Sequence, residues 1–79
     1  MNVEKKLKEI VADIFKVKIS RLKPSTRFVD DLNAKSIDIM ALIAATENAF
    51  DIKTSREETA NNKTIKQTAD YIKKRLREK

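Results

Sequence analysis

The sequence predicts an all-α protein, a small four-helix bundle built from three longer helices and one short helix. The 79-residue chain contains no glycine and a single proline, whereas hairpin turns depend heavily on glycine. Its apolar residues recur at spacings of three and four, which is the period of a helix with one buried face. A chain of this length has room for one core, so we expect a single domain over residues 1–79.

The first helix is predicted near the N-terminus, with Asn2 as its N-cap. The apolar positions on its inner face are Val3, Leu7, Ile10, Val11, Ile14 and Phe15. A long loop follows, and long ordered loops need contacts with the core. The apolar residues available for those contacts are Ile19, Leu22, Pro24 and Phe28.

The second helix is predicted to begin at Ser36 and to end near Phe50 or Asp51. From spacing alone Ser36 is an N-cap, and Asp38 in the first turn suits the positive end of the helix dipole. One face carries Ile39, Leu42, Ile43, Thr46 and Phe50, and a second carries Ile37, Met40, Ala41 and Ala44, continued by Glu47 and Asn48. Such a helix is either buried on both faces or offers one to a partner. We favour the partner face, because so small a chain has little with which to bury the helix all round.

Two capping boxes predict the remaining helices. SREE, residues 55–58, fits the start of a short third helix, and TIKQ, residues 64–67, fits the start of the last one. The inner face of the last helix is formed by Ile65, Ala69, Ile72 and Leu76. Tyr71 is placed at the edge of that face.

Several residue types that support catalysis are missing. The chain has no cysteine and no histidine, which excludes a thiolate nucleophile and a Ser–His pair, and without glycine it has no Gly-rich phosphate loop. We therefore expect that the protein is not an enzyme. Its adjacent acids lack the spacing of a calcium loop, so no metal site is expected. No apolar run reaches the length of a membrane span and no signal peptide opens the chain, which predicts a cytoplasmic protein without a transmembrane segment.

The formal net charge of +6 would suit an anionic partner. One alternative function is therefore a small basic helical protein that binds nucleic acid or the ribosome. Against it, the few aromatic residues fit core positions rather than a stacking surface, and no recognition helix is evident. We expect no nucleic-acid partner.

The segment FVDDLNAKSIDIM, residues 28–40, resembles the modification motif of acyl carrier proteins. That motif is an acidic pair and a leucine, a short link, and a serine followed by an aliphatic residue and an aspartate. The likeness continues in ENAFDI, residues 47–52, and in TIKQTADYI, residues 64–72, in one register. The resemblance implies an acyl-carrier-protein-like fold. It also implies that a phosphopantetheinyl transferase attaches 4′-phosphopantetheine from coenzyme A to Ser36.

In that family the thiol of the attached arm holds acyl intermediates as thioesters and presents them to other enzymes. The resemblance thus implies acyl-loading and acyl-processing enzymes of fatty acid, lipid or polyketide biosynthesis as partners. The residues expected to contact them surround Ser36 and continue along the second helix: Lys35, Ile37, Asp38, Met40, Ala41, Ala44 and Glu47. We expect the carrier to be a monomer.

The sequence also departs from the family pattern. Lys35 precedes the serine where an acid is usual, and Asn33 stands where glycine is common. The family is acidic overall, whereas this chain is basic. We interpret these differences as those of a specialised carrier with its own partners. Lys35 leaves open a further alternative, an unmodified carrier-like module that acts only by binding a partner.

Overall fold

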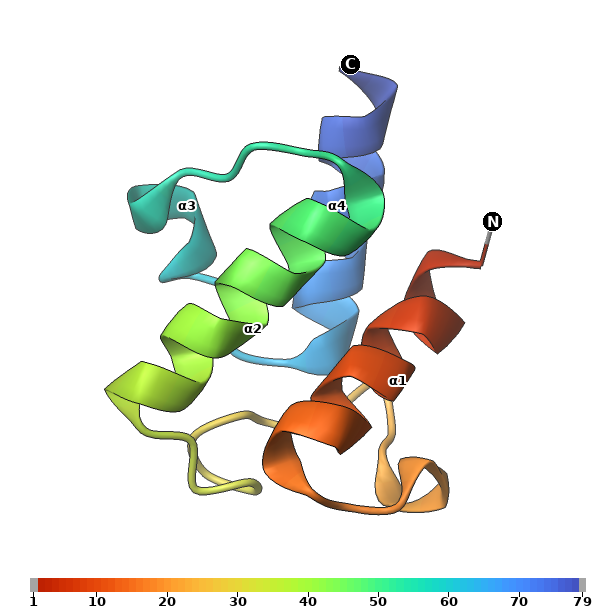
Figure 1. The fold of residues 1–79 in the computed structure, drawn as a ribbon, viewed down its shortest axis with the longest axis vertical. Helices are drawn as coiled ribbons and strands as arrows, with labels where there is room; N and C mark the ends of the chain where they lie inside the picture. Colours follow the sequence, from red (N-terminus) through yellow and green to blue (C-terminus); the bar gives the residue numbers. More distant parts are fainter. Residues whose placement is uncertain (1, 79) are drawn as a thin grey trace.

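The computed structural model describes residues 2–78, and its elements confirm the predicted all-α fold. The three longer helices are α1, Val3–Phe15, α2, Ser36–Phe50, and α4, Ile65–Arg77, and the short one is α3, Arg56–Thr59 (Figure 1). A single 3₁₀ turn, η1, Ile19–Arg21, was not predicted. It lies in the long loop between α1 and α2.

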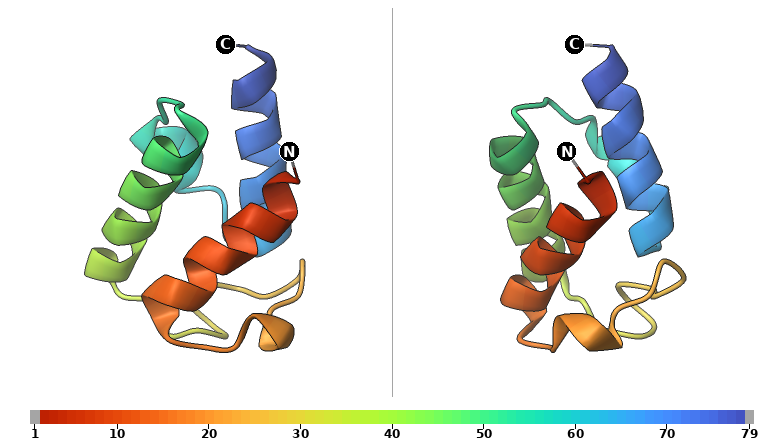
Figure 2. Two further views of the ribbon diagram at one scale, coloured as in Figure 1. Left: turned by 45° about the vertical axis from the view of Figure 1, so that its right-hand side comes forward. Right: turned by 90° about the vertical axis from the view of Figure 1, so that its right-hand side faces the viewer.

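The longer helices surround one core. Helix α1 packs against both α2 and α4, and α3 lies across the bundle from α1 (Figures 1 and 2). The loop of residues 16–35 passes beneath the lower ends of α1 and α2 in these views. The buried apolar side chains are Val3, Leu7, Val11, Leu22, Phe28, Leu42, Phe50, Ile52, Ile65, Ala69 and Ile72. The predicted inner faces of all three longer helices contribute to this core.

The long loop is fixed to the core by only two of its four predicted anchors. Leu22 and Phe28 are buried, and the Phe28 ring stacks on Phe15 with ring centroids 6.5 Å apart. Ile19 is 43% exposed and Pro24 is also exposed, so the prediction was wrong for these two residues. The physical reason is the turn closed by the Leu22 N–H and the Ile19 carbonyl, at 3.0 Å, which buries Leu22 and leaves Ile19 on the surface.

The loop also provides hydrogen-bond acceptors for the start of α4. The first N–H groups of a helix have no partner within the helix. Here the Ile65 N–H donates to the Thr26 carbonyl at 3.1 Å, and the Lys66 N–H donates to the Pro24 carbonyl at 2.9 Å. The predicted capping box provides further acceptors for these N–H groups. Thr64 Oγ1 accepts from the Gln67 N–H, and Gln67 Oε1 accepts from the Thr64 N–H. Loop and helix therefore order each other.

Among residues 2–78, three hold the left-handed backbone conformation that glycine tolerates best, although the chain has no glycine. They are Lys16 at φ 57°, Asn33 at φ 55° and Asp51 at φ 53°. Lys16 and Asp51 end α1 and α2. Asparagine and aspartate accept this conformation more readily than lysine does, because their short polar side chains bond locally. Lys16 is therefore the position with the largest conformational cost.

We expect Lys16→Gly to stabilise the protein. Removing the Cβ relieves a conformational cost of about 1–2 kcal/mol in the folded state. Glycine also has more freedom in the unfolded chain, which offsets part of this gain, so the net stabilisation should be about 1 kcal/mol. Urea unfolding would measure it. The matched control is Lys6→Gly in the exposed interior of α1, which should instead cost about 0.5–1 kcal/mol. Equal losses in the two variants would contradict the role given to the Lys16 conformation.

Candidate functional site

The start of α2 differs from the prediction in one respect. Lys35, in extended conformation at φ −101° and ψ 170°, is the N-cap, and Ser36 is the first helical residue. The prediction that Ser36 caps the helix was wrong. The Asp38 carboxylate accepts a hydrogen bond from the Lys35 N–H at 3.0 Å, which is the role of the acid in a capping box and moves the cap one residue earlier. Ser36 is exposed, and its hydroxyl forms no hydrogen bond with any of residues 2–78.

The loop before Ser36 is held by its own acidic residues. Asp31 accepts from the Arg27 N–H at 2.8 Å and pairs with the Arg27 guanidinium at 3.2 Å, and these hydrogen bonds hold its pKa below the usual range. Asp30 pairs with the same guanidinium at 3.5 Å. The left-handed Asn33 then turns the chain, and the Ala34 N–H reaches back to the Phe28 carbonyl at 2.9 Å. Asparagine can therefore serve where the resembled family commonly has glycine.

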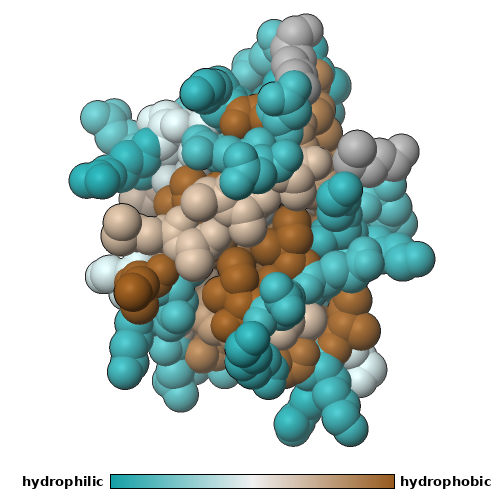
Figure 3. Space-filling view, in the orientation of Figure 1, coloured by the Kyte–Doolittle hydropathy of each residue, from teal (hydrophilic) through white to brown (hydrophobic). Residues whose placement is uncertain are grey.

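Helix α2 buries one of its two apolar faces and exposes the other. Leu42, Thr46 and Phe50 are buried, and the Thr46 hydroxyl donates to main-chain carbonyls one turn earlier. Ile37 is 73% exposed and Met40 65%, and Ala41 and Ala44 are exposed beside them. Figure 3 shows apolar side chains gathered across the middle of this view, framed by hydrophilic ones. The alternative in which α2 is buried on both faces is thus wrong for this chain.

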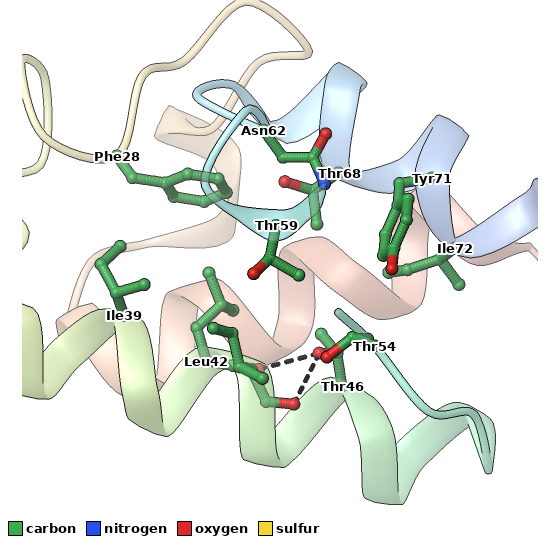
Figure 4. A pocket seen from close by; sticks show the side chains of 11 residues that line it. Phe28, Ile39, Leu42, Thr46, Thr54, Thr59, Asn62, Thr68, Tyr71 and Ile72 are labelled. Carbon is green, nitrogen blue, oxygen red and sulfur yellow. Dashed lines mark hydrogen bonds between the residues drawn. The ribbon is translucent and has the colours of Figure 1, made fainter. Parts of the chain in front are cut away.

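A groove of about 450 Å³ lies between the start of α2, α3 and the preceding loop. Ser36 lines it, together with Val29, Ala34, Lys35, Ile39, Met40, Ile43, Arg56, Thr59 and Ala60. A smaller inner cavity of about 40 Å³ lies among α2, α3, α4 and Phe28 (Figure 4). Ile39, Ile43 and Thr59 line both spaces. These three side chains therefore separate the surface beside Ser36 from the interior.

One hydrogen-bonded group holding α3 was missed by the sequence reasoning. The Tyr71 hydroxyl of α4 accepts from the Ser55 N–H at 3.2 Å and donates to a Glu58 carboxylate oxygen at 2.9 Å. Burial is the main cause that raises the Tyr71 pKa. Ser55 caps α3 as predicted, with its Oγ accepting from the Glu58 N–H at 3.3 Å, but the Glu58 carboxylate bonds Tyr71 instead of completing the box. No local pattern indicates a contact across 13 residues.

Glu47, predicted to contact partners, is half-buried and engaged within the chain. Its Oε2 accepts from the Thr54 N–H at 2.9 Å and from the Thr54 hydroxyl at 2.8 Å. These hydrogen bonds hold the Glu47 pKa below its usual range. The carboxylate thereby connects the end of α2 to the segment that leads into α3.

The lowered Glu47 pKa predicts an acid dependence of stability. A carboxylate with a depressed folded-state pKa contributes stability that is present above its ordinary pKa and is lost as the pH falls through the folded value. We expect Glu47→Gln to lower the free energy of unfolding near pH 7 and to reduce the loss between about pH 5 and pH 2. Urea titrations across that range would measure it. Glu9→Gln makes the same charge change on the exposed side of α1, so an equal change in both variants would argue against the Thr54 contact.

The other predicted site residues are placed as follows. Lys35 is exposed, and Asp38 is half-buried with its carboxylate on the Lys35 N–H. Residues 2–78 contain no cluster of His, Cys, Asp or Glu side chains suited to a metal ion. Within the same residues, no helix has the length and apolar character needed to cross a membrane.

Fold and site together define a small four-helix protein with an accessible serine at the first position of α2. Comparison with known proteins agrees. A family model described as a phosphopantetheine attachment site matches residues 5–72. An acyl carrier protein from Buchnera aphidicola subsp. Schizaphis graminum is 42% identical over 71 residues, 90% of each chain. A solved structure of the acyl carrier protein from Enterococcus faecalis superposes with a TM-score of 0.79 at 27% identity, over 92% of each chain.

The chain belongs to the phosphopantetheine-attachment family, in which the comparisons group it with acyl carrier proteins. The predicted family and cofactor are thereby confirmed. The comparisons favour the function of an acyl carrier protein over the nucleic-acid-binding alternative.

Proposed function

We propose that the protein is an acyl carrier whose 4′-phosphopantetheine arm is attached through Ser36 Oγ. The observation that carries the proposal is the Ser36 hydroxyl itself, which is exposed, free of hydrogen bonds to residues 2–78 and located at the first turn of α2. A helix N-terminus favours a negative group, so it suits a phosphodiester at this position. When attached, the arm supplies the thiol that this cysteine-free chain lacks.

The inner cavity is the proposed shelter for the start of an acyl chain. Its lining includes Phe28, Leu42 and Ile72, and the groove beside Ser36 leads to it past Ile39, Ile43 and Thr59. The volume of about 40 Å³ is far below the roughly 150 Å³ of a cavity that holds one benzene molecule. A chain of several carbons therefore requires the wall formed by α3 to move outward.

The exposed face of α2 is the proposed docking surface for the transferase and the acyl-processing enzymes. Ile37, Met40, Ala41 and Ala44 supply apolar area that begins beside Ser36 and continues along α2, and Lys35 borders it. Asp38 and Glu47 remain predicted contacts, although both carboxylates already serve the carrier's own fold. In this function the chain presents substrates and performs no catalysis, and we place it in the cytoplasm as a monomer.

The intact mass of the purified protein tests the attachment. Incubation with coenzyme A and a promiscuous phosphopantetheinyl transferase should add the mass of one phosphopantetheine group, and protein isolated from its own cells should already contain it. Absence of the group in both samples would favour the unmodified interaction module instead.

A further inference from the structure

We propose that the docking partners of this carrier approach Ser36 with a carboxylate-bearing surface. The groove between α2 and α3 has two charged residues in its lining, Lys35 and Arg56, and both are cationic. Both side chains are exposed, and neither forms an ion pair with any of residues 2–78. We call this feature the cationic groove. The inference about its partners rests on the proposed function, because Ser36 is one of the residues that line the groove.

The nearby acidic residues do not contribute to the lining of this groove. Asp30 and Asp31 are paired with Arg27, and the Asp38 carboxylate accepts from the Lys35 main chain. Further along α2, Glu47 is engaged by Thr54. These carboxylates keep their negative charge, but they are held by the carrier's own loop and helix ends and lie outside the groove in which Lys35 and Arg56 meet a partner.

The apolar part of the groove strengthens the expected charge effect. Val29 is 60% exposed and Met40 65%, so a docked partner would remove water from around Lys35 and Arg56. Cations that lose water need an opposing charge, and basic groups on a partner would meet like charge instead. A surface with carboxylates facing Lys35 and Arg56, and aliphatic side chains over Val29 and Met40, satisfies both requirements.

Two synthetic helical peptides test the inference without requiring modification of Ser36. They share one leucine face, and their polar face carries only glutamate in one peptide and only lysine in the other. Each is titrated into unmodified protein, with main-chain NMR shifts as the readout. The glutamate peptide should bind roughly tenfold more tightly than the lysine peptide, with the largest shifts at Val29, Lys35, Met40 and Arg56. The preference should weaken as salt rises, because the screening length falls to about 8 Å at physiological ionic strength.

Charge-reversal variants separate the groove from the overall positive charge. Lys35→Glu with Arg56→Glu should invert the peptide preference. The matched control is Lys5→Glu with Lys74→Glu, which changes the net charge equally at exposed positions of α1 and α4 and should retain the preference. Equal effects of the two double variants, or no preference in the wild type, would overturn the inference. A preference at the groove in a protein that the transferase never modifies would leave the charge inference standing and refute the attachment to Ser36.

Discussion

Ser36→Ala will abolish phosphopantetheine attachment and leave the protein folded. The attachment needs the Ser36 oxygen, and no other hydroxyl occupies the first turn of α2 at the groove. Because Lys35 is the N-cap and Asp38 provides the capping carboxylate, the substitution removes no capping bond. Alanine is also the best helix former, so the change in unfolding free energy should stay within about 0.5 kcal/mol. Intact mass after transferase treatment, together with urea unfolding, measures both effects.

Ser55→Ala is the matched control for that experiment. It loses the hydrogen bond from the Glu58 N–H and should cost about 1 kcal/mol, yet it should accept the group as the wild type does. An adduct on the Ser36→Ala protein would show that another residue is the attachment site. A loss of folding in that variant would show that Ser36 supports the helix after all.

Phe50→Ala will cost about 3–5 kcal/mol of unfolding free energy. Phe50 is only 3% exposed, at the end of the buried face of α2, and belongs to the cluster formed by α1, α2 and α4. Removing a buried ring loses its transfer free energy and leaves a cavity that the helices fill incompletely. Small domains have about 5–15 kcal/mol in total, so the variant should unfold at a much lower urea concentration.

Met40→Ala reports on the opposite face of the same helix. Met40 is 65% exposed, so its truncation should change stability by no more than about 0.5 kcal/mol. If Met40→Ala were the more destabilising of the two, the assignment of buried and exposed faces would be reversed. The pair therefore tests which face of α2 is free to meet a partner.

The helices were predictable because their signals are local. Apolar residues at helical spacing identified the buried faces of α1, α2 and α4. The capping residues Asn2 and Thr64, whose side chains bond only three residues ahead, identified where α1 and α4 begin. The start of α2 at Ser36 was predicted correctly, but its N-cap was not, because a serine at a helix start is itself a common cap. The extended backbone of Lys35, and the hydrogen bond from its N–H to the Asp38 carboxylate, make Lys35 the cap instead of Ser36.

The rest of the site depends on contacts between distant parts of the chain. Arg56 and Thr59 enter the groove because α3 lies against α2, and nothing in the SREE segment indicates which helix it will approach. The exposure of Ile19 follows from a 3₁₀ turn too short to leave a periodic pattern. The charges could be counted from the sequence. It could not be read from the sequence that Asp30, Asp31 and Glu47 already form contacts within the chain.

Helix α3 has four residues and buries none of them, so polar contacts such as those of Tyr71 and Ser55 are what hold it in place. Detaching it exposes little apolar surface and breaks few hydrogen bonds, and its opening free energy should therefore lie far below that of global unfolding. Amide hydrogen exchange in residues 55–60 should accordingly be faster than in the centre of α4. Helix α3, which contributes Thr59 to the wall between Ser36 and the interior, is thus the segment that can yield while the remainder of the domain stays intact.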